Sequence, residues 1–533
     1  MNYFIPDWKQ TGGKWKDERT LNIIKLFMEN EIDYQLVLIH YLPFLRYKAM
    51  EHSIYPKNYW RIYDTLQNIQ IQDGHPIALK ELDLPEDAQQ VYTPHGVLLL
   101  KNEEIRGEIV FNEFAFVNHV VDHFGDMPGY YIYFFDDRGF ISSRQYITEQ
   151  NYIGRIDYYN EFSEITLTEY FGNDERVVVS DQGNPDFDHR EYPNMYALIA
   201  EVLRKKFKAF QSEKDSLVTV TEKEIMTLTN MLQKEHKIIR IFDDDQNISD
   251  FEQQSLVTMM EKSLCVVTDS EKKKNELEEF LENKASTPVK VVNIPLYTTD
   301  LTLGVSNSVP HLTIYWKANQ SFEEMAVSQK LLIKKIIKDD KLALMIEVAD
   351  EEMQEELEEA QRDIVDAYFS IDSLSEDFKN TATYLYAKRI KKLYKEQEKA
   401  VEQLKETEQW ADLVAASEVY ERIGFSVAPN LTQLKKNLHR ARIYLDFNEN
   451  SDIQTHALTV SAGIPMIIKT ESDYLIDGKN GTVLKKVSDF NEVLDFYLYE
   501  LDNWNNVLVE NVQLIEEFGS AATMDKWRRI FYG

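Results

Sequence analysis

Residues 442–468 read Arg442-Ile-Tyr-Leu-Asp-Phe-Asn-Glu-Asn-Ser-Asp-Ile-Gln-Thr-His-Ala-Leu-Thr-Val-Ser-Ala-Gly-Ile-Pro-Met-Ile-Ile468, and residues 477–481 read Asp477-Gly-Lys-Asn-Gly481. The first run begins as an apolar strand and then turns at polar residues. A helix follows, and it ends at a small-Gly-x-Pro step before a second apolar strand. Strand, turn, helix and strand in this order are typical of a parallel α/β unit.

This segment resembles the donor-binding segment of two-domain, GT-B glycosyltransferases. In active members of that class, one Glu lies on the turn and a second lies eight residues later, five before the Gly. Counting back from Gly463, these positions are Asn450 and Leu458 here. A leucine side chain cannot accept a hydrogen bond from a ribose or stabilise an oxocarbenium ion. The segment therefore predicts a donor site whose framework is kept and whose chemistry is lost.

The charges near the turn also argue against a bound nucleotide sugar. A helix that opens at Ser451 or Asp452 would aim its N-terminus at a pyrophosphate. However, Asp452 and Glu449 place negative charge at that point, and only Lys317 follows the predicted strand 312–316. We assign no catalytic, cofactor-binding or metal-binding residue. We interpret four residues as degenerate donor-site positions, namely Asn450, Ser451, Asp452 and Leu458.

The composition limits the class of protein. The chain has 533 residues, 43% of them hydrophobic, and a formal net charge of −32. This length favours two or three domains. Acidic surfaces repel nucleic acid and anionic lipid, so neither is expected as a direct partner. With one cysteine, no signal-like start and no long apolar run, we expect a cytoplasmic protein that meets membranes only through partners.

Alternating strand and helix patterns divide the chain. Residues 1–75 and 192–300 predict a first Rossmann-like half, to which a C-terminal helix at 515–533 could return. Residues 301–514 predict a second Rossmann-like half with a helical insertion near 350–421. Between the parts of the first half, residues 76–191 contain short β-rich runs separated by turn signals. The predicted fold class is α/β, with two GT-B-like Rossmann halves and an inserted extended antiparallel β-sheet domain.

Two shorter patterns predict helices. Apolar residues at spacings of three and four from 387 to 404, with mixed charge between them, indicate a helix, which could be half of a helical hairpin. We interpret it as a solvated surface helix, with a partner-binding arm as the alternative. His119 and His123 would share one face of another helix. Zinc needs further ligands, so we interpret the histidine pair as structural.

The run Tyr130-Tyr-Ile-Tyr-Phe-Phe135 alternates aromatic residues on both faces of a strand. One face should belong to a core. The face formed by Tyr131, Tyr133 and Phe135 could stack on sugar rings or dock a protein partner. The alternative is a sheet covered on both faces by its own chain.

Several motifs, spread in order along the chain, resemble one protein family. They are Tyr3-Phe-Ile-Pro-Asp-Trp8, Phe135-Asp-Asp-Arg-Gly-Phe-Ile-Ser-Ser143, Ser461-Ala-Gly-Ile-Pro465, the turn 474–481 and Leu501-Asp-Asn-Trp-Asn505. Together they look like the first accessory secretory protein of the accessory Sec system. The segment from about 350 to 421 matches least.

The resemblance implies a cytosolic, non-catalytic protein with a glycosyltransferase-like fold and no cofactor. It also implies partners, namely the other accessory secretory proteins, an accessory SecA-type motor ATPase and a glycosylated serine-rich repeat adhesin preprotein. The implied role is that of an adaptor or chaperone in adhesin export.

Two other hypotheses remain open at this point. The chain could be an active GT-B glycosyltransferase that modifies a serine-rich polypeptide and uses Glu449 through a one-residue register shift. It could instead be a stabilising partner of such a transferase, which would also keep a hollow site.

Overall fold

The computed structural model describes residues 1–9, 18–51, 58–85, 87–94, 96–112, 114–123, 128–211, 213–230, 232, 237–243, 246–295, 297–318, 322–449 and 452–533. The chain forms two compact units, which are residues 1–296 with 527–533 (unit 1) and residues 297–526 (unit 2). Among the described residues, no helix combines the length and apolar character needed to cross a membrane.

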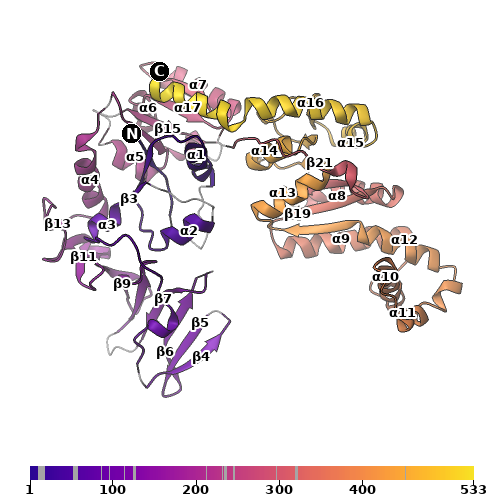
Figure 1. The fold of residues 1–533 in the computed structure, drawn as a ribbon, viewed down its shortest axis with the longest axis horizontal. Coiled ribbons are helices and arrows are strands. Elements are labelled where there is room, and N and C mark those ends of the chain that lie inside the picture. Colours follow the sequence, from indigo (N-terminus) through magenta and orange to yellow (C-terminus); the bar gives the residue numbers. More distant parts are fainter. Residues whose placement is uncertain are drawn as a thin grey trace. The chain divides into compact units, whose positions relative to one another are not determined.

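Unit 1 contains a seven-stranded sheet with the order β17-β16-β15-β14-β1-β2-β3, and all its neighbours are parallel (Figure 1). Strands β1 to β3 follow one another toward one edge of the sheet, and strands β14 to β17 toward the other edge, so the topological switch point lies between β1 and β14, as in Rossmann-type sheets. The central strands are buried along their whole length and consist mainly of Val, Ile and Leu, which is typical of parallel strands covered on both faces. The strands are β1 (Asn2–Ile5), β2 (Tyr34–Leu38), β3 (Tyr59–Arg61), β14 (Ser216–Val220), β15 (Ile238–Ile241), β16 (Cys265–Thr268) and β17 (Val291–Asn293).

Helices connect these strands, and local capping residues fix where several of them begin. The Asn194 side chain accepts a 3.0 Å hydrogen bond from the backbone N–H of Ala197 at the start of α4. Ser270 does the same for α7. The helices are α1 (Glu18–Glu29), α2 (Leu45–Glu51), α3 (Ile62–Leu66), α4 (Met195–Lys206), α5 (Lys223–Asn230), α6 (Gln253–Glu261) and α7 (Glu271–Lys284).

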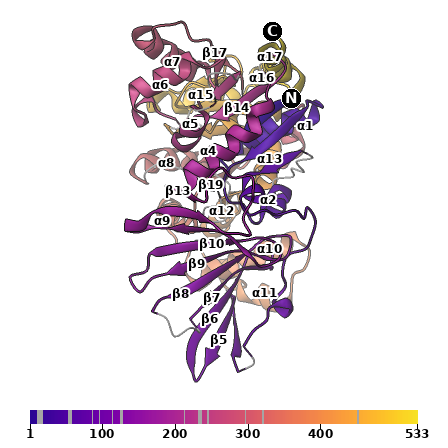
Figure 2. The ribbon, with the colours of Figure 1, turned by 90° about the vertical axis from the view of Figure 1, so that its left-hand side faces the viewer.

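Unit 1 also carries a ten-stranded antiparallel sheet in which each strand pairs with its neighbours along the chain (Figure 2). Val97, Ile109 and Phe135 belong to a buried core that packs under residues 77–88. The strands are β4 (Gln89–Thr93), β5 (Gly96–Lys101), β6 (Glu104–Phe111), β7 (Val117–Asp122), β8 (Tyr130–Phe135), β9 (Ile141–Ile147), β10 (Ile153–Tyr159), β11 (Ile165–Tyr170), β12 (Arg176–Val179) and β13 (Glu191–Tyr192).

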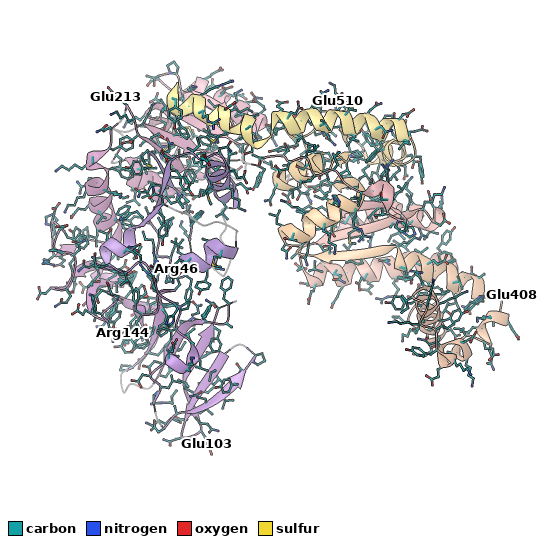
Figure 3. All side chains as sticks on the ribbon, in the orientation of Figure 1. Arg46, Glu103, Arg144, Glu213, Glu408 and Glu510 are labelled. Atoms are coloured by element: carbon teal, nitrogen blue, oxygen red, sulfur yellow. The ribbon has the colours of Figure 1, made fainter. Side chains whose placement is uncertain are left out.

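A buried ion network joins the β8–β9 turn to the parallel sheet of unit 1. The Arg61 guanidinium donates a 2.9 Å hydrogen bond to Asp136, and Arg138 donates one of 2.7 Å to the same carboxylate. Arg138 also pairs with Asp64 at 2.8 Å. Arg46, which Figure 3 labels, donates to Asp137 at 2.9 Å. Burial opposes ionisation of Asp136, but the two arginines outweigh it and hold the pKa of Asp136 below its usual range.

Unit 2 contains a six-stranded sheet with the order β20-β19-β18-β21-β22-β23, and all its neighbours are parallel. Gly463 ends α14 with φ +71°, and a Cβ there would lie 2.6 Å from Leu508. The strands are β18 (Leu312–Lys317), β19 (Leu342–Val348), β20 (Ile423–Val427), β21 (Ala441–Asp446), β22 (Met466–Ile468) and β23 (Gly481–Val483). The helices outside the β19–β20 connection are α8 (Phe322–Lys338), α13 (Leu431–Arg440), α14 (Ile453–Ser461), α15 (Phe490–Leu498), α16 (Leu501–Glu517) and α17 (Ser520–Tyr532), the last of which ends in unit 1.

The connection from β19 to β20 is a helical arm formed by α9 (Glu351–Phe369), α10 (Glu376–Arg389), α11 (Lys395–Ala400) and α12 (Trp410–Glu421). The prediction of an unbroken helix over residues 387–404 is wrong, because the run contains the end of α10, a turn and α11. The helix α10 ends at Arg389 because Lys391 adopts a left-handed conformation, with φ 57°. The α/β class with an inserted antiparallel sheet is confirmed.

The helix predicted around His119 and His123 is also wrong, because residues 117–122 form strand β7. The His119 ring lies 5.4 Å from the Phe134 ring, and the His123 ring lies 4.5 Å from Tyr130. Each histidine therefore packs on the neighbouring strand β8. The spacing of two histidines fits one face of a helix and one face of a strand equally, so it could not decide between them.

The Asp136 network generates a stability prediction. Replacing Arg138 by Met leaves Asp136 and Asp64 near each other with one fewer cation, so the variant should lose about 3–5 kcal/mol of unfolding free energy. Urea unfolding followed by tryptophan fluorescence measures this loss. Arg106→Met is the matched control, since Arg106 is 34% exposed and 3.9 Å from Glu104, and it should change stability by less than about 0.5 kcal/mol. Equal losses in both variants would contradict the prediction.

Candidate functional site

Three charged residues meet at the carboxyl edge of the unit 2 sheet. Lys317 is the last residue of β18, Glu347 is the last but one of β19, and Asp446 is the last of β21. Because the strands are parallel, their carboxyl ends share one edge, which is where α/β sheets bind ligands. All three residues are buried, at 9%, 6% and 2% exposure.

Lys317 is held by two carboxylates of its own chain. Its Nζ lies 3.1 Å from Glu347 Oε1, and it also forms an ion pair with Asp452. Asp452 is at the same time the N-cap of α14, where its Oδ1 accepts a 3.0 Å hydrogen bond from the backbone N–H of Thr455. The N-terminus of α14 and the nearby cation therefore already share an anion, the Asp452 carboxylate.

Two stacked tyrosines complete the edge. The Tyr315 hydroxyl donates a 2.5 Å hydrogen bond to Glu347, and the Tyr444 hydroxyl donates one of 3.1 Å to Asp446. Their ring centroids are 6.1 Å apart and the rings stack. Burial raises the pKa of Tyr444 well above its ordinary value, and the neighbouring carboxylates add to the effect. Both tyrosines therefore stay neutral donors to carboxylates.

The electrostatics of the edge are those of a closed ion cluster. Burial disfavours the charge on Lys317, yet Asp452 and Glu347 outweigh it and raise the pKa of Lys317. Burial also disfavours the charge on Asp452, and Lys317 outweighs it and lowers the pKa of Asp452. Lys317 thus faces more than one carboxylate. The cluster neutralises its own cation and offers no surplus positive charge to a phosphate.

The other predicted donor positions fare differently. Leu458 lies in α14 and is partly exposed, with no polar atom in its side chain. Asn450 and Ser451 lie outside the described residues. Glu449, the acid that a shifted register would use, is 80% exposed and pairs with Lys469 at 3.1 Å. The structure therefore places the partly exposed Asp452 at the edge of the Lys317 cluster and leaves Glu449 in solvent.

The predicted aromatic face of β8 is only partly a surface. Phe135 is 4% exposed and belongs to the core of the ten-stranded sheet. Tyr131 and Tyr133 are half-buried. The Arg144 guanidinium lies 4.9 Å from the centre of the Tyr131 ring and pairs with Asp157 at 2.7 Å. Figure 3 labels Arg144 on this sheet.

Sequence reasoning missed residues in both places. Glu347 and Asp446 were overlooked although each is an acidic residue near the carboxyl end of a buried apolar strand, which is a usable signal. On the ten-stranded sheet it overlooked Arg144 and Arg176, whose guanidinium groups lie over Tyr131 and Tyr170. Pairing between neighbouring strands brings these arginines to the tyrosines, and no short sequence motif predicts these contacts. In the described part of the chain, no three His, Cys, Asp or Glu side chains are grouped as a metal site.

The fold of the two units is that of GT-B glycosyltransferases. The crystal structure of the pneumococcal O-GlcNAc transferase GtfA in complex with UDP and GlcNAc matches with a TM-score of 0.66 at 11% identity, over 100% of this chain and 98% of that one. Two further solved structures are more similar. The Glycosylation Associate Protein (Gap123) complex from Streptococcus agalactiae has a TM-score of 0.76 at 20% identity, with 99% of each chain covered. The crystal structure of accessory secretory protein 1, 2 and 3 in Streptococcus pneumoniae has a TM-score of 0.73 at 20% identity, and the match covers 99% of this chain and 98% of that chain.

The sequence comparison narrows this class to one family. One family model matches residues 1–532 of this chain. It describes the first Asp protein of the accessory Sec system, in which Asp stands for accessory secretory protein. The chain belongs to this family. Its member from Streptococcus gordonii is 24% identical over 99% of this chain and 98% of its own length. The member from Staphylococcus aureus is 22% identical over 100% of this chain and 99% of its own length. The family resemblance inferred from the sequence is confirmed.

The Lys317 cluster predicts the cost of removing its cation. Lys317→Met leaves the buried Glu347 carboxylate and the partly exposed Asp452 carboxylate without their cation, so unit 2 should lose about 3–5 kcal/mol of unfolding free energy. The triple variant that adds Glu347→Gln and Asp452→Asn should recover most of the loss. Urea unfolding compares these variants with Lys469→Met, an exposed control whose one ion pair among the described residues is with Glu449. A Lys317→Met protein as stable as the control would contradict a closed cluster.

The same cluster predicts a pH dependence. Because the pKa of Asp452 is lowered on folding, its contribution is present above about pH 4 and is lost as the pH falls through the folded pKa. In Lys317→Met, burial without the cation should instead raise the pKa of Asp452, so acidification would now stabilise the fold. Thermal unfolding from about pH 2 to pH 8 covers the range of both slopes. Parallel curves for the two proteins would count against the pairing.

Proposed function

We propose that this chain is a non-catalytic component of the accessory Sec export machinery and acts as an adaptor or chaperone for glycosylated serine-rich repeat adhesins. One observation carries the non-catalytic part of the proposal. The Asp452 carboxylate caps α14 and pairs with Lys317, at the point where a donor pyrophosphate would need free N–H groups and a free cation.

The energetics support this interpretation. A nucleotide sugar would have to displace Asp452 from both the helix N-terminus and Lys317. The displaced carboxylate would then face Glu347 and the incoming phosphates, which carry charge of the same sign. A site that must first break its own buried ion pair binds its ligand weakly.

The active-transferase alternative finds little support in the described residues. Leu458 supplies no acid, and the substitute Glu449 is 80% exposed and paired with Lys469. A catalytic carboxylate gains most when it acts in a water-excluded site, and Glu449 lacks that environment. No structural observation among these residues favours a second function over the adaptor role.

Relatives support the partner assignment. The Streptococcus agalactiae and Streptococcus pneumoniae structures described above are complexes, the latter of accessory secretory protein 1, 2 and 3. We extend this assembly to the present chain and add two partners that family membership suggests, an accessory SecA-type motor ATPase and the adhesin preprotein. The chain would work in the cytoplasm, where the preprotein is available before export.

We assign the half-buried tyrosines of β8 to the glycosylated substrate. Tyr131 and Tyr133 lie on the same face of the strand, and the Arg144 guanidinium stacks on Tyr131. Aromatic rings and planar guanidinium groups suit sugar rings and polypeptide alike. Phe135 takes no part, because it is buried in the core.

Affinity purification tests the partner assignment. A tagged full-length chain, expressed from its own locus, should recover the second and third accessory secretory proteins from a cytosolic extract. A tagged unrelated cytosolic protein of similar acidity is the control. Folded protein that recovers neither partner, or that recovers a glycosyltransferase instead, would overturn the adaptor assignment.

A second experiment tests the absence of catalysis. The purified chain should bind UDP and UDP-sugars too weakly for calorimetry at millimolar ligand, and it should transfer no sugar to a serine-rich peptide. The Glu449→Gln variant is the matched comparison. Sugar transfer that disappears in Glu449→Gln would restore the active-transferase hypothesis.

A further inference from the structure

The end of the helical arm carries a dense basic and apolar surface on a chain whose net charge is −32. Residues 388–399 contain six Lys or Arg and two Glu. Residues 388–396 are all exposed. Large apolar side chains lie among the charges, with Tyr386 at 57%, Ile390 at 42% and Tyr394 at 66% exposure. We call residues 386 and 388–395 the tip patch; α10 and α11, which carry it, are labelled in Figure 1.

The tip patch rests on a packed support. Tyr384 is 7% exposed, and its ring lies 4.2 Å from Lys405 Nζ and 6.2 Å from the Trp410 ring. Ala387, at 3% exposure, and Val401, fully buried, fix the two ends of the exposed segment. The exposed apolar side chains are therefore presented by an ordered backbone.

The turn inside the patch keeps a lysine at a position that favours glycine. The backbone N–H of Lys392 donates to the Ala387 carbonyl at 2.9 Å, and that of Lys391 donates to Lys388 at 3.2 Å. This is a Schellman motif, in which the left-handed residue is ordinarily Gly. Here it is Lys391, with φ 57°, and a side chain in that region costs stability. The lysine at this position is thus not explained by folding.

Most of the cations in the patch have no carboxylate partner in the part of the chain that the structure describes. Arg389 pairs with Glu421, and Lys388 lies 6.0 Å from the centre of the Tyr384 ring. Among the residues that the structure describes, Lys391, Lys392 and Lys395 form no ion pair. These three neighbouring cations, unpaired within the described residues, create a local field opposite in sign to the net charge of the molecule.

We propose that the tip patch docks an acidic segment of a partner protein, whose apolar side chains cover Tyr386, Ile390 and Tyr394. Charge complementarity selects an acidic partner, and Tyr and Arg are the residues that dominate the energy of protein interfaces. A lipid surface fits less well, because α11 has only six residues and the chain as a whole would be repelled by anionic lipid. The inference does not depend on the adaptor role, since it concerns a surface away from the donor edge.

Fluorescence anisotropy with a labelled synthetic peptide of alternating Glu and Leu tests the proposal on the full chain. The matched probe has Lys in place of every Glu. The acidic peptide should bind and the basic one should not. Reversing the three free cations (Lys391→Glu, Lys392→Glu and Lys395→Glu together) should weaken binding at least ~10-fold, and Tyr394→Ser should weaken it several-fold. Raising the salt concentration should weaken the wild-type complex.

Two controls separate docking from folding. Lys379→Glu reverses a 56% exposed lysine in the first turn of α10 and should leave binding unchanged. Lys391→Gly removes one cation at a position that suits glycine, so it should raise or keep the melting temperature while weakening binding. Equal binding of both peptides, or no effect of the triple reversal, would overturn the proposal. So would binding to phosphatidylglycerol vesicles through these residues without binding to the acidic peptide.

Discussion

The ten-stranded sheet depends on the mutual neutralisation of buried charges at one turn. Asp136 lies fully buried between Arg61 and Arg138. A buried carboxylate without these cations, or the buried cations without the carboxylate, would destabilise the fold. This network joins the antiparallel sheet to the parallel sheet of unit 1. A second contact seals the same junction, where the rings of Tyr41 and Tyr158 pack 5.9 Å apart. Burial raises the pKa of Tyr41 to about 12, so its hydroxyl stays a neutral donor to Ser143.

The same rule of charge compensation governs the carboxyl edge of unit 2, with a different consequence. In a transferase, cations and helix N-termini at this edge would wait for an external anion. In this chain Lys317 and the start of α14 are satisfied by Asp452. The framework around them is intact, since Gly463 still makes its left-handed turn against Leu508. The fold thus keeps the residues that shape the edge and has replaced an external anion with an internal one.

Much of the fold was accessible from the sequence because long apolar runs and turn residues repeat regularly. The strands of unit 2 follow from runs such as 342–348, which are largely apolar and bounded by polar residues. The predictions of secondary structure were wrong where the spacing of residues fits more than one structure. His119 and His123 share a face in a helix and in a strand, and the run 387–404 has helical spacing but is broken by the backbone of Lys391. For the site, the sequence identified Asp452 and Lys317 separately, while the pairing of Lys317 with Glu347 required the strand order.

The return of the chain's end to unit 1 has a consequence for synthesis. Trp527 is fully buried, and its ring packs edge-on against Phe27 at 5.6 Å. Phe531 lies against the same Phe27 ring at 5.8 Å. At a ribosomal rate of roughly 5–20 residues per second, the interval between making the first and the last of these rings is on the order of 25–100 s. Throughout that interval the Phe27 face of helix α1 lacks these two rings, so the nascent chain must cover it with a chaperone or with transient contacts until residue 531 has been made.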